Sequence, residues 1–217
     1  MTATFPVAAP VSADLEPHAR NGIRPLVAAA GLTFLTAWIV GLSVWPTNLS
    51  VCATGTQILD ALAGHTGVAT VQFVTSQGIA GLALAVVLTA LARPARMTGA
   101  AAVAVSLTQC ALGVHLAGWI APEGHAGTAA TVYGLIDRLD GVKMLLLAAT
   151  AVLASIPLLR NRTRPRFLPY LGLLLAAAIA VSGIGYLLLS TALAPAAYVS
   201  GVLLLIWVPA VALTARR

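Results

Sequence analysis

Long apolar runs separated by short polar segments organise this sequence. A helix needs about 20 apolar residues to cross the ~30 Å hydrocarbon core of a bilayer. The last apolar stretch, 167–215, contains no charged residue and is long enough for two helices. Pro195 divides it, because proline disfavours helical backbone in the residue before it. The pattern predicts six membrane-spanning helices, at 25–45, 67–92, 98–120, 142–159, 167–190 and 193–214.

The composition supports this reading. The chain is 59% hydrophobic and 8% charged, with a mean hydropathy of +0.96, whereas soluble domains carry about 25% charged residues. Intrinsic disorder needs the opposite balance, low hydrophobicity and high charge. Two cysteines are too few for a disulfide-rich framework. We therefore expect an all-α integral membrane protein, a bundle of six transmembrane helices.

Basic residues predict the orientation of the bundle. With six spans, ten of the twelve lysines and arginines fall on one side: Arg20, Arg24, Arg93, Arg96, Arg160, Arg162, Arg164, Arg166, Arg216 and Arg217. The positive-inside rule then places both termini in the cytoplasm. The Ala, Leu and Val bias suits a bacterial cytoplasmic (inner) membrane. Residues 1–22, with three prolines and no helical period, are expected to form a disordered tail before a transmembrane domain at 23–217.

Two predicted outer loops are longer than a tight turn. In the first, the apolar residues within 55–62 predict a short interfacial helix. The second, 121–141, has an apolar stripe at i, i+3, i+4 and i+7 that predicts an amphipathic helix leading directly into the fourth span. Each loop ends in a polar residue and a glycine, Gln77-Gly78 and Asp140-Gly141. This similarity suggests tandem helical hairpins, which would bring the two polar segments together on the outer face.

The unusual polar residues gather toward the outer boundary, since the inner halves of the spans hold no Asp, Glu, Lys or His. Ionisable residues within spans are expensive and are functional candidates. Asp137, Asp140 and Lys143 stand at i, i+3 and i+6, so they can reach one another along a helix. With His115, the two aspartates are candidate acid–base residues. The candidate ligand-binding residues are Gln72, Gln77, Gln109, Trp119 and Lys143.

A structural interpretation of the same residues stays open at this point. Asp140 and Lys143 can form an ion pair at the membrane boundary, His115 can bond a backbone carbonyl or a lipid headgroup, and the glutamines can hydrogen-bond between helices. Polar side chains near the end of a span cost little. Both interpretations predict contacts among these groups, and only the functional one requires a ligand.

Several other classes of site have no support in the sequence. No nucleotide-binding loop, catalytic-serine motif or spaced pair of metal ligands is present, so no metal or cofactor is expected. The arginine-rich segment 160–166 lacks aromatic residues that would stack on bases, which argues against nucleic acid. Cys110 lies about 15 Å below the outer end of its span, too deep to bond with Cys52, so two free thiols are expected.

Two functions remain. The first is a non-enzymatic accessory, binding or small permease-like protein, whose outward-facing polar pocket holds a lipid or small apolar molecule. The alternative is an intramembrane enzyme that uses an outer-leaflet carboxylic acid for cyclisation or isomerisation of an apolar substrate. The expected partners are membrane lipids, a small apolar ligand, and either a second copy of the chain or another membrane protein.

Overall fold

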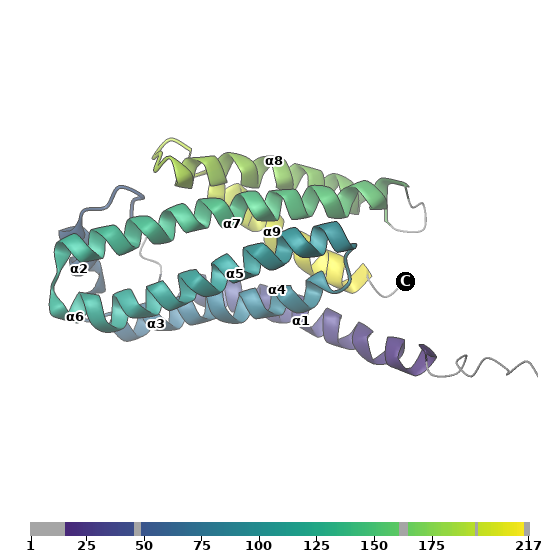
Figure 1. The fold of residues 1–217 in the computed structure, drawn as a ribbon, viewed down its shortest axis with the longest axis horizontal. Helices are drawn as coiled ribbons and strands as arrows, with labels where there is room; N and C mark the ends of the chain where they lie inside the picture. The colour runs from purple at the N-terminus through teal and green to yellow at the C-terminus, as the bar shows by residue number, and fades with distance from the viewer. Residues whose placement is uncertain (1–15, 46–48, 161–164, 194, 215–217) are drawn as a thin grey trace, which may run out of the picture.

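The computed structural model describes residues 16–45, 49–160, 165–193 and 195–214. Within these ranges there is no strand, and six helices are long and apolar enough to cross a membrane. The predicted all-helical bundle is therefore confirmed (Figure 1). Most of the expected tail, residues 1–22, lies outside the described residues, and the first helix already begins at Glu16.

Four of the six spans are single helices, and the fourth span is the longest of these. The second and third spans each contain a segment in which the helix changes from α to π geometry. The spans are α1 (Glu16–Val44); α3 (Thr66–Phe73), η1 (Val74–Ile79) and α4 (Ala80–Leu88); α5 (Arg93–His115), η2 (Leu116–Ile120) and α6 (Ala121–Glu123); α7 (Ala126–Arg160); α8 (Phe167–Leu187); and α9 (Ala196–Thr214). The short helix α2 (Gly55–Leu62) lies in the loop after α1. Segments η1 and η2 are π-helical.

Helix ends differ from the expected ones where proline or backbone geometry decides them. Helix α4 stops at Leu88, and α5 starts at Arg93 rather than 98 because Pro94 occupies its first turn, where a missing N–H costs nothing. Helix α8 stops at Leu187, and Leu189 then takes a positive φ of 50°. Helix α9 begins directly after Pro195, which confirms the predicted break.

Both helices predicted in the outer loops are present. Thr54 caps α2: its hydroxyl accepts from the Gln57 amide, and the Gln57 side chain accepts from the Thr54 amide. The stripe in the second loop lies on α7, which runs unbroken from Ala126 into the fourth span. Its 35 residues correspond to about 52 Å, far more than a bilayer core. The first part of α7 therefore extends beyond the spans formed by α8 and α9 (Figure 1).

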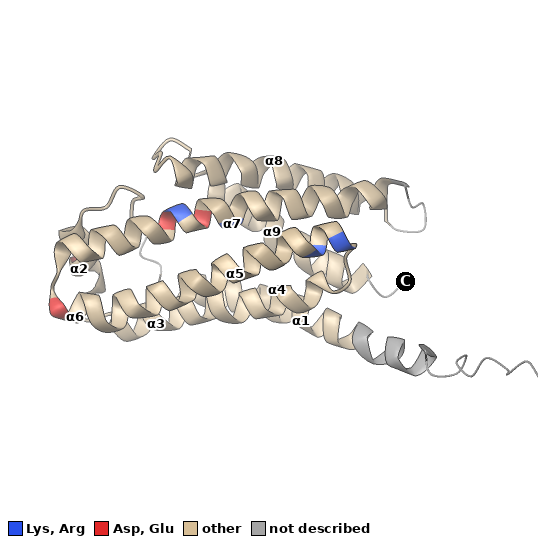
Figure 2. Ribbon diagram, in the orientation of Figure 1, with Lys and Arg blue, Asp and Glu red and all other residues tan. Residues whose placement is uncertain are grey.

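The apolar interior falls into two clusters. The span core joins α1, α4, α5, α7, α8 and α9 around residues such as Phe34, Ala151 and Val208. The cap core lies at the end where α2, α3 and α6 meet the first part of α7, and includes Ile58, Leu62 and Leu116. We call this part of the molecule the cap, and we call the opposite end, which carries Arg93, Arg96 and Arg166, the arginine end. Figure 2 shows Arg93 and Arg96 at the start of α5.

Helix α7 holds the bundle together through its long contacts with α5 and α8. Gly141 makes the contact with α8 possible. A Cβ at this position would lie 2.7 Å from the Gly183 carbonyl oxygen and 2.8 Å from the Leu187 amide nitrogen, both backbone atoms that cannot move aside cheaply. The end of α8 is thereby fixed beside Gly141.

We predict that Gly141→Ala pushes α7 and α8 apart and lowers the free energy of unfolding by about 1–3 kcal/mol, as expected for overpacking. Gly134→Ala is the matched control on the same helix, because a Cβ there meets nothing within 4 Å. That control should be neutral or should stabilise by up to about 1 kcal/mol through helix propensity. SDS titration of the protein in mixed micelles measures both. Equal stability of the two variants would contradict the close contact.

Candidate functional site

A polar network separates the span core from the cap core. We call it the junction; its members are Gln77, Ser106, Gln109, Asp137, Asp140 and Lys143. Asp140 lies twenty residues before Arg160 on α7, which is about 30 Å, one bilayer core, from the arginine end. Its neighbour Gly141 packs against Leu187, the last residue of α8. The junction thus lies level with the cap-side end of the shorter spans (Figure 2).

Asp140 is the centre of the junction. It forms an ion pair with Lys143, one turn along α7. From α5, Gln109 Nε2 donates to Asp140 Oδ1 at 3.0 Å and to the Ile136 carbonyl oxygen at 3.0 Å. Two contacts of the structural interpretation, the ion pair and the interhelical glutamine, are therefore confirmed. The described residues give His115 no hydrogen bond to a backbone carbonyl; its ring stacks on Trp119 instead.

Lys143 is the one lysine in the sequence, and its side chain is buried with 6% exposure. Its Nζ also donates to Gln77 Oε1 at 2.9 Å, and Ser106 Oγ donates to the same oxygen at 2.9 Å. An ammonium carries three N–H donors. Two of them have acceptors among the described residues, Asp140 and Gln77, which leaves one for a further acceptor.

The π-helical segment η1 positions Gln77. The Ala80 amide bonds to the Thr75 carbonyl five residues back, which gives this turn one more residue than an α-turn. Hydroxyls satisfy carbonyls near the wide turn: Ser76 Oγ donates to the Gln72 oxygen at 2.7 Å and Thr75 Oγ1 to the Val71 oxygen at 2.8 Å. Such bonds make a departure from α-helix tolerable inside a bundle.

A small cavity lies beneath Lys143 on the side of the span core. Its polar lining comes from Ser76, Gln77, Ser106 and Lys143, and its apolar lining from Phe34, Trp38, Gly81, Leu84, Ala102, Leu147 and Leu204. The space open to the centre of a water molecule is about 20 Å³, enough for one or two waters. The cavity therefore combines a charged end with aromatic and aliphatic walls.

Asp137 is buried with 6% exposure beside this network. Among the described residues its Oδ2 has no hydrogen-bond partner, and neither does Oε1 of Gln109, a side chain with 1% exposure. Tyr133 lies one turn before Asp137 on α7, and Tyr186 lies on the part of α8 that packs against Gly141. The junction thus contains two buried oxygen acceptors that no donor serves.

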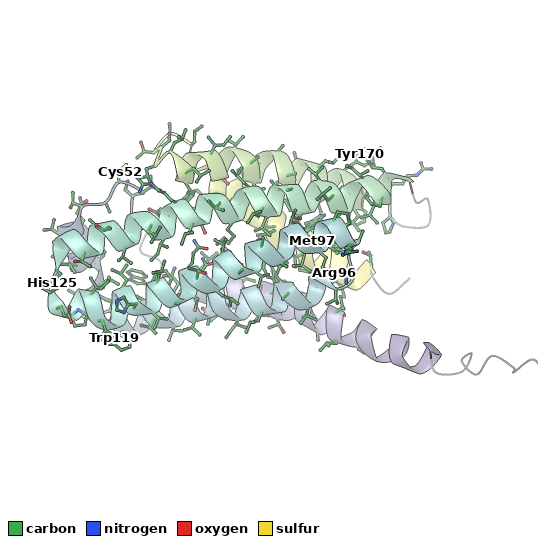
Figure 3. The ribbon with its side chains drawn as sticks, viewed as in Figure 1. Cys52, Arg96, Met97, Trp119, His125 and Tyr170 are labelled. Carbon is green, nitrogen blue, oxygen red and sulfur yellow. The ribbon has the colours of Figure 1, made fainter. Side chains whose placement is uncertain are left out.

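The structure does not bring every predicted site residue to the junction. His115 is exposed and stacks on Trp119, with ring centroids 5.8 Å apart. Trp119 is 60% exposed and points outward from the cap (Figure 3). Gln72 is half-buried one turn from η1, and only its backbone oxygen takes part in the hydrogen bonds described above. Gln77, Gln109, Asp137, Asp140 and Lys143 are the predicted residues that lie together.

Three members of this region were absent from the predicted site: Ser106, Tyr133 and Tyr186. Tyr133 precedes Asp137 by four residues, a spacing that makes helix neighbours and was available in the sequence. Tyr186 and Ser106 lie on other helices, so no local pattern in the sequence predicts that they belong to this region. Gln77 and Asp140 both contact Lys143, so the two polar segments do lie together, as the hypothesis of tandem hairpins requires. The duplication itself stays a prediction.

Metal-binding groups and cysteines add little to the junction. In the described part of the chain, no three His, Cys, Asp or Glu side chains gather as metal ligands. Glu123 and His125 pair at 3.3 Å, but both are exposed at the tip of the cap. Cys52 and Cys110 are free thiols, as predicted.

We predict that Asp140→Asn lowers the free energy of unfolding by about 3–5 kcal/mol, because it leaves the buried Lys143 ammonium without its anion. The double variant Asp140→Asn/Lys143→Met removes both charges and should recover most of that loss. SDS titration in mixed micelles measures each variant against the wild type. A double variant no more stable than Asp140→Asn would show that the ion pair is not what the single change disrupts.

Comparison with known proteins gives no match to a family model, to a curated protein or to a solved structure. The chemistry of the junction is therefore the basis for the function proposed next.

Proposed function

We propose that this polytopic membrane protein is a non-enzymatic binding, accessory or small permease-like bundle, whose junction holds the polar end of a lipid or small apolar molecule. The observation that carries the proposal is the cavity beneath Lys143. One of its ends offers a buried ammonium with a free N–H, and its walls are apolar. That pairing of one specific polar anchor with apolar walls is typical of sites for amphipathic molecules.

The position of the cavity supports a ligand that comes from the membrane. It lies among α1, α4, α5, α7 and α9, just inside the level at which α8 ends. An amphipathic molecule in a bilayer has its polar group at this level and its apolar part below it. We infer that its oxygen acceptor meets Lys143 while its apolar part lies against Phe34, Trp38 and Leu204.

The present volume sets a condition on binding. Space for one or two waters is too small for a lipid chain. Trp38 and Phe34 of α1, whose ring centroids lie 6.5 Å apart in a tilted arrangement, must move for a larger ligand to enter. The π-helical segment beside them provides the less regular backbone at which such movement is expected.

The enzymatic alternative has less support. It relies on His115 as a base next to Asp137 or Asp140, but His115 is exposed and stacks on Trp119. A general base has to lie within hydrogen-bonding reach of the reacting group. We therefore favour binding over catalysis.

Native mass spectrometry of the protein in mild detergent tests the proposal. We expect a discrete bound mass in the wild type that is lost in Lys143→Met, because methionine keeps the length of the side chain and removes the donor. Arg138→Met is the matched control, since it removes an exposed positive charge from the same helix. Wild-type protein without a bound mass, or equal retention in both variants, would overturn the proposal.

The proposed orientation places both termini in the cytoplasm and the cap outside. We predict that a membrane-impermeant maleimide labels the exposed Cys52 in intact cells. In a Cys52→Ser/Arg93→Cys variant, with the new thiol at the arginine end, labelling should require permeabilised cells. The half-buried Cys110 is replaced by alanine in both backgrounds. The reverse pattern would show the opposite orientation.

A further inference from the structure

The carboxylate of Asp137 is separate from the cavity and has requirements of its own. It is not among the residues that line the cavity, and its Oδ2 is buried without a donor, as is Gln109 Oε1. Gln109 binds the Ile136 carbonyl, so the two unserved oxygens belong to groups anchored at neighbouring positions of α7. Burying an acceptor without a donor is costly. Whatever completes this region must donate hydrogen bonds.

Charge narrows the choice of donor. The ionisable groups of the junction are two carboxylates and one ammonium: Asp137 and Lys143 are buried, and Asp140 is half-buried. The adjacent Arg138 is exposed. Lys143 already balances Asp140 through the ion pair, which leaves Asp137 without a counter-charge among the described residues. A water could donate a hydrogen bond but would supply no counter-charge, and a buried carboxyl without a counter-charge tends to take up a proton. A cation supplies both the hydrogen-bond donor and the counter-charge that keeps Asp137 ionised.

The surroundings of Asp137 are aromatic. Tyr133 lies one turn before Asp137 on α7, and Tyr186 lies between Gly183 and Leu187, the two residues of α8 that approach Gly141. The contact of Gly141 with Leu187 explains how α8 brings Tyr186 there. Tyr133 and Tyr186 are only half-buried, so the group extends from the carboxylate to the molecular surface.

Tyrosine rings beside a carboxylate suit an organic ammonium better than a bare metal ion. Ring faces attract ammonium groups, and the carboxylate and amide oxygens accept its N–H donors. Hard metal ions instead need about six or more oxygen ligands. The group lies level with the end of α8, and the end of a helix that crosses the membrane is where lipid headgroups are expected.

We propose that Asp137, Gln109, Tyr133 and Tyr186 form a binding site for the ammonium group of an amine-bearing lipid headgroup, such as that of phosphatidylethanolamine. The site does not depend on what occupies the cavity beneath Lys143. It makes the cap-side end of α7 and α8 selective for one class of headgroup.

The test uses full-length protein in nanodiscs of phosphatidylethanolamine mixed with phosphatidylglycerol, released into native mass spectrometry. Wild-type protein should retain phosphatidylethanolamine over phosphatidylglycerol, and Asp137→Asn should reduce that preference about tenfold, the loss of one charge-assisted contact. Asp60→Asn is the matched control, since Asp60 is an exposed aspartate of the cap. No preference in the wild type, or an unchanged preference in Asp137→Asn, overturns the site.

Thermal unfolding in detergent separates the sources of the cation. If ethanolamine hydrochloride raises the unfolding temperature of the wild type but not that of Asp137→Asn, the ammonium group suffices for binding. If phosphatidylethanolamine raises it and ethanolamine does not, the lipid is needed. Equal stabilisation by sodium chloride at the same ionic strength indicates an alkali ion and overturns the proposal. Tyr186→Leu replaces Asp137→Asn if that variant does not fold, with the same expected loss. The double variant Asp140→Asn/Lys143→Met removes both charges of the ion pair together and should keep the headgroup preference, so failure of this site and failure of the cavity are distinguishable.

Discussion

The buried ammonium of Lys143 is the constraint on which the middle of the molecule depends. A charge with 6% exposure is stable only if the protein supplies its counter-charge and acceptors. Asp140 supplies the charge from the same helix, and Gln77 supplies an acceptor from another span. Gln109 and Ser106 then hold those two groups in place. One lysine thereby ties together α5, α7 and η1, and fixes the height at which the span core ends and the cap core begins.

This arrangement explains why the third and fourth spans are longer than a bilayer requires. Apolar packing continues past the junction into the cap core, where Ile58 and Leu62 of α2 cover the extension of α7. The junction consequently has apolar packing on both sides, the span core on one and the cap core on the other. The cap thereby limits the contact of this polar network with water.

The sequence predicts the fold well and the site in part, for physical reasons. Hydropathy reveals spans because each must be apolar over its whole length, and Pro94 and Pro195 sharpen two boundaries that hydropathy alone misplaces. Helical spacing finds the grouping of Asp137, Asp140 and Lys143, because these share one helix. Contacts between helices follow no local spacing in the sequence. The position of Tyr186 near Asp137 depends on how α7 and α8 are rotated against each other, and the rotation of the third span decides that His115 stacks outward on Trp119.

The wide turn at η1 decides which face of the second span meets the lysine. An extra residue in one turn rotates the helix that follows it by about 100° relative to an unbroken α-helix, the angle of one residue. Gln77 lies within this turn, and its side-chain oxygen accepts from both Lys143 and Ser106. The acceptor of the only lysine in the sequence therefore depends on one irregular turn of backbone rather than on the spacing of apolar residues along the span.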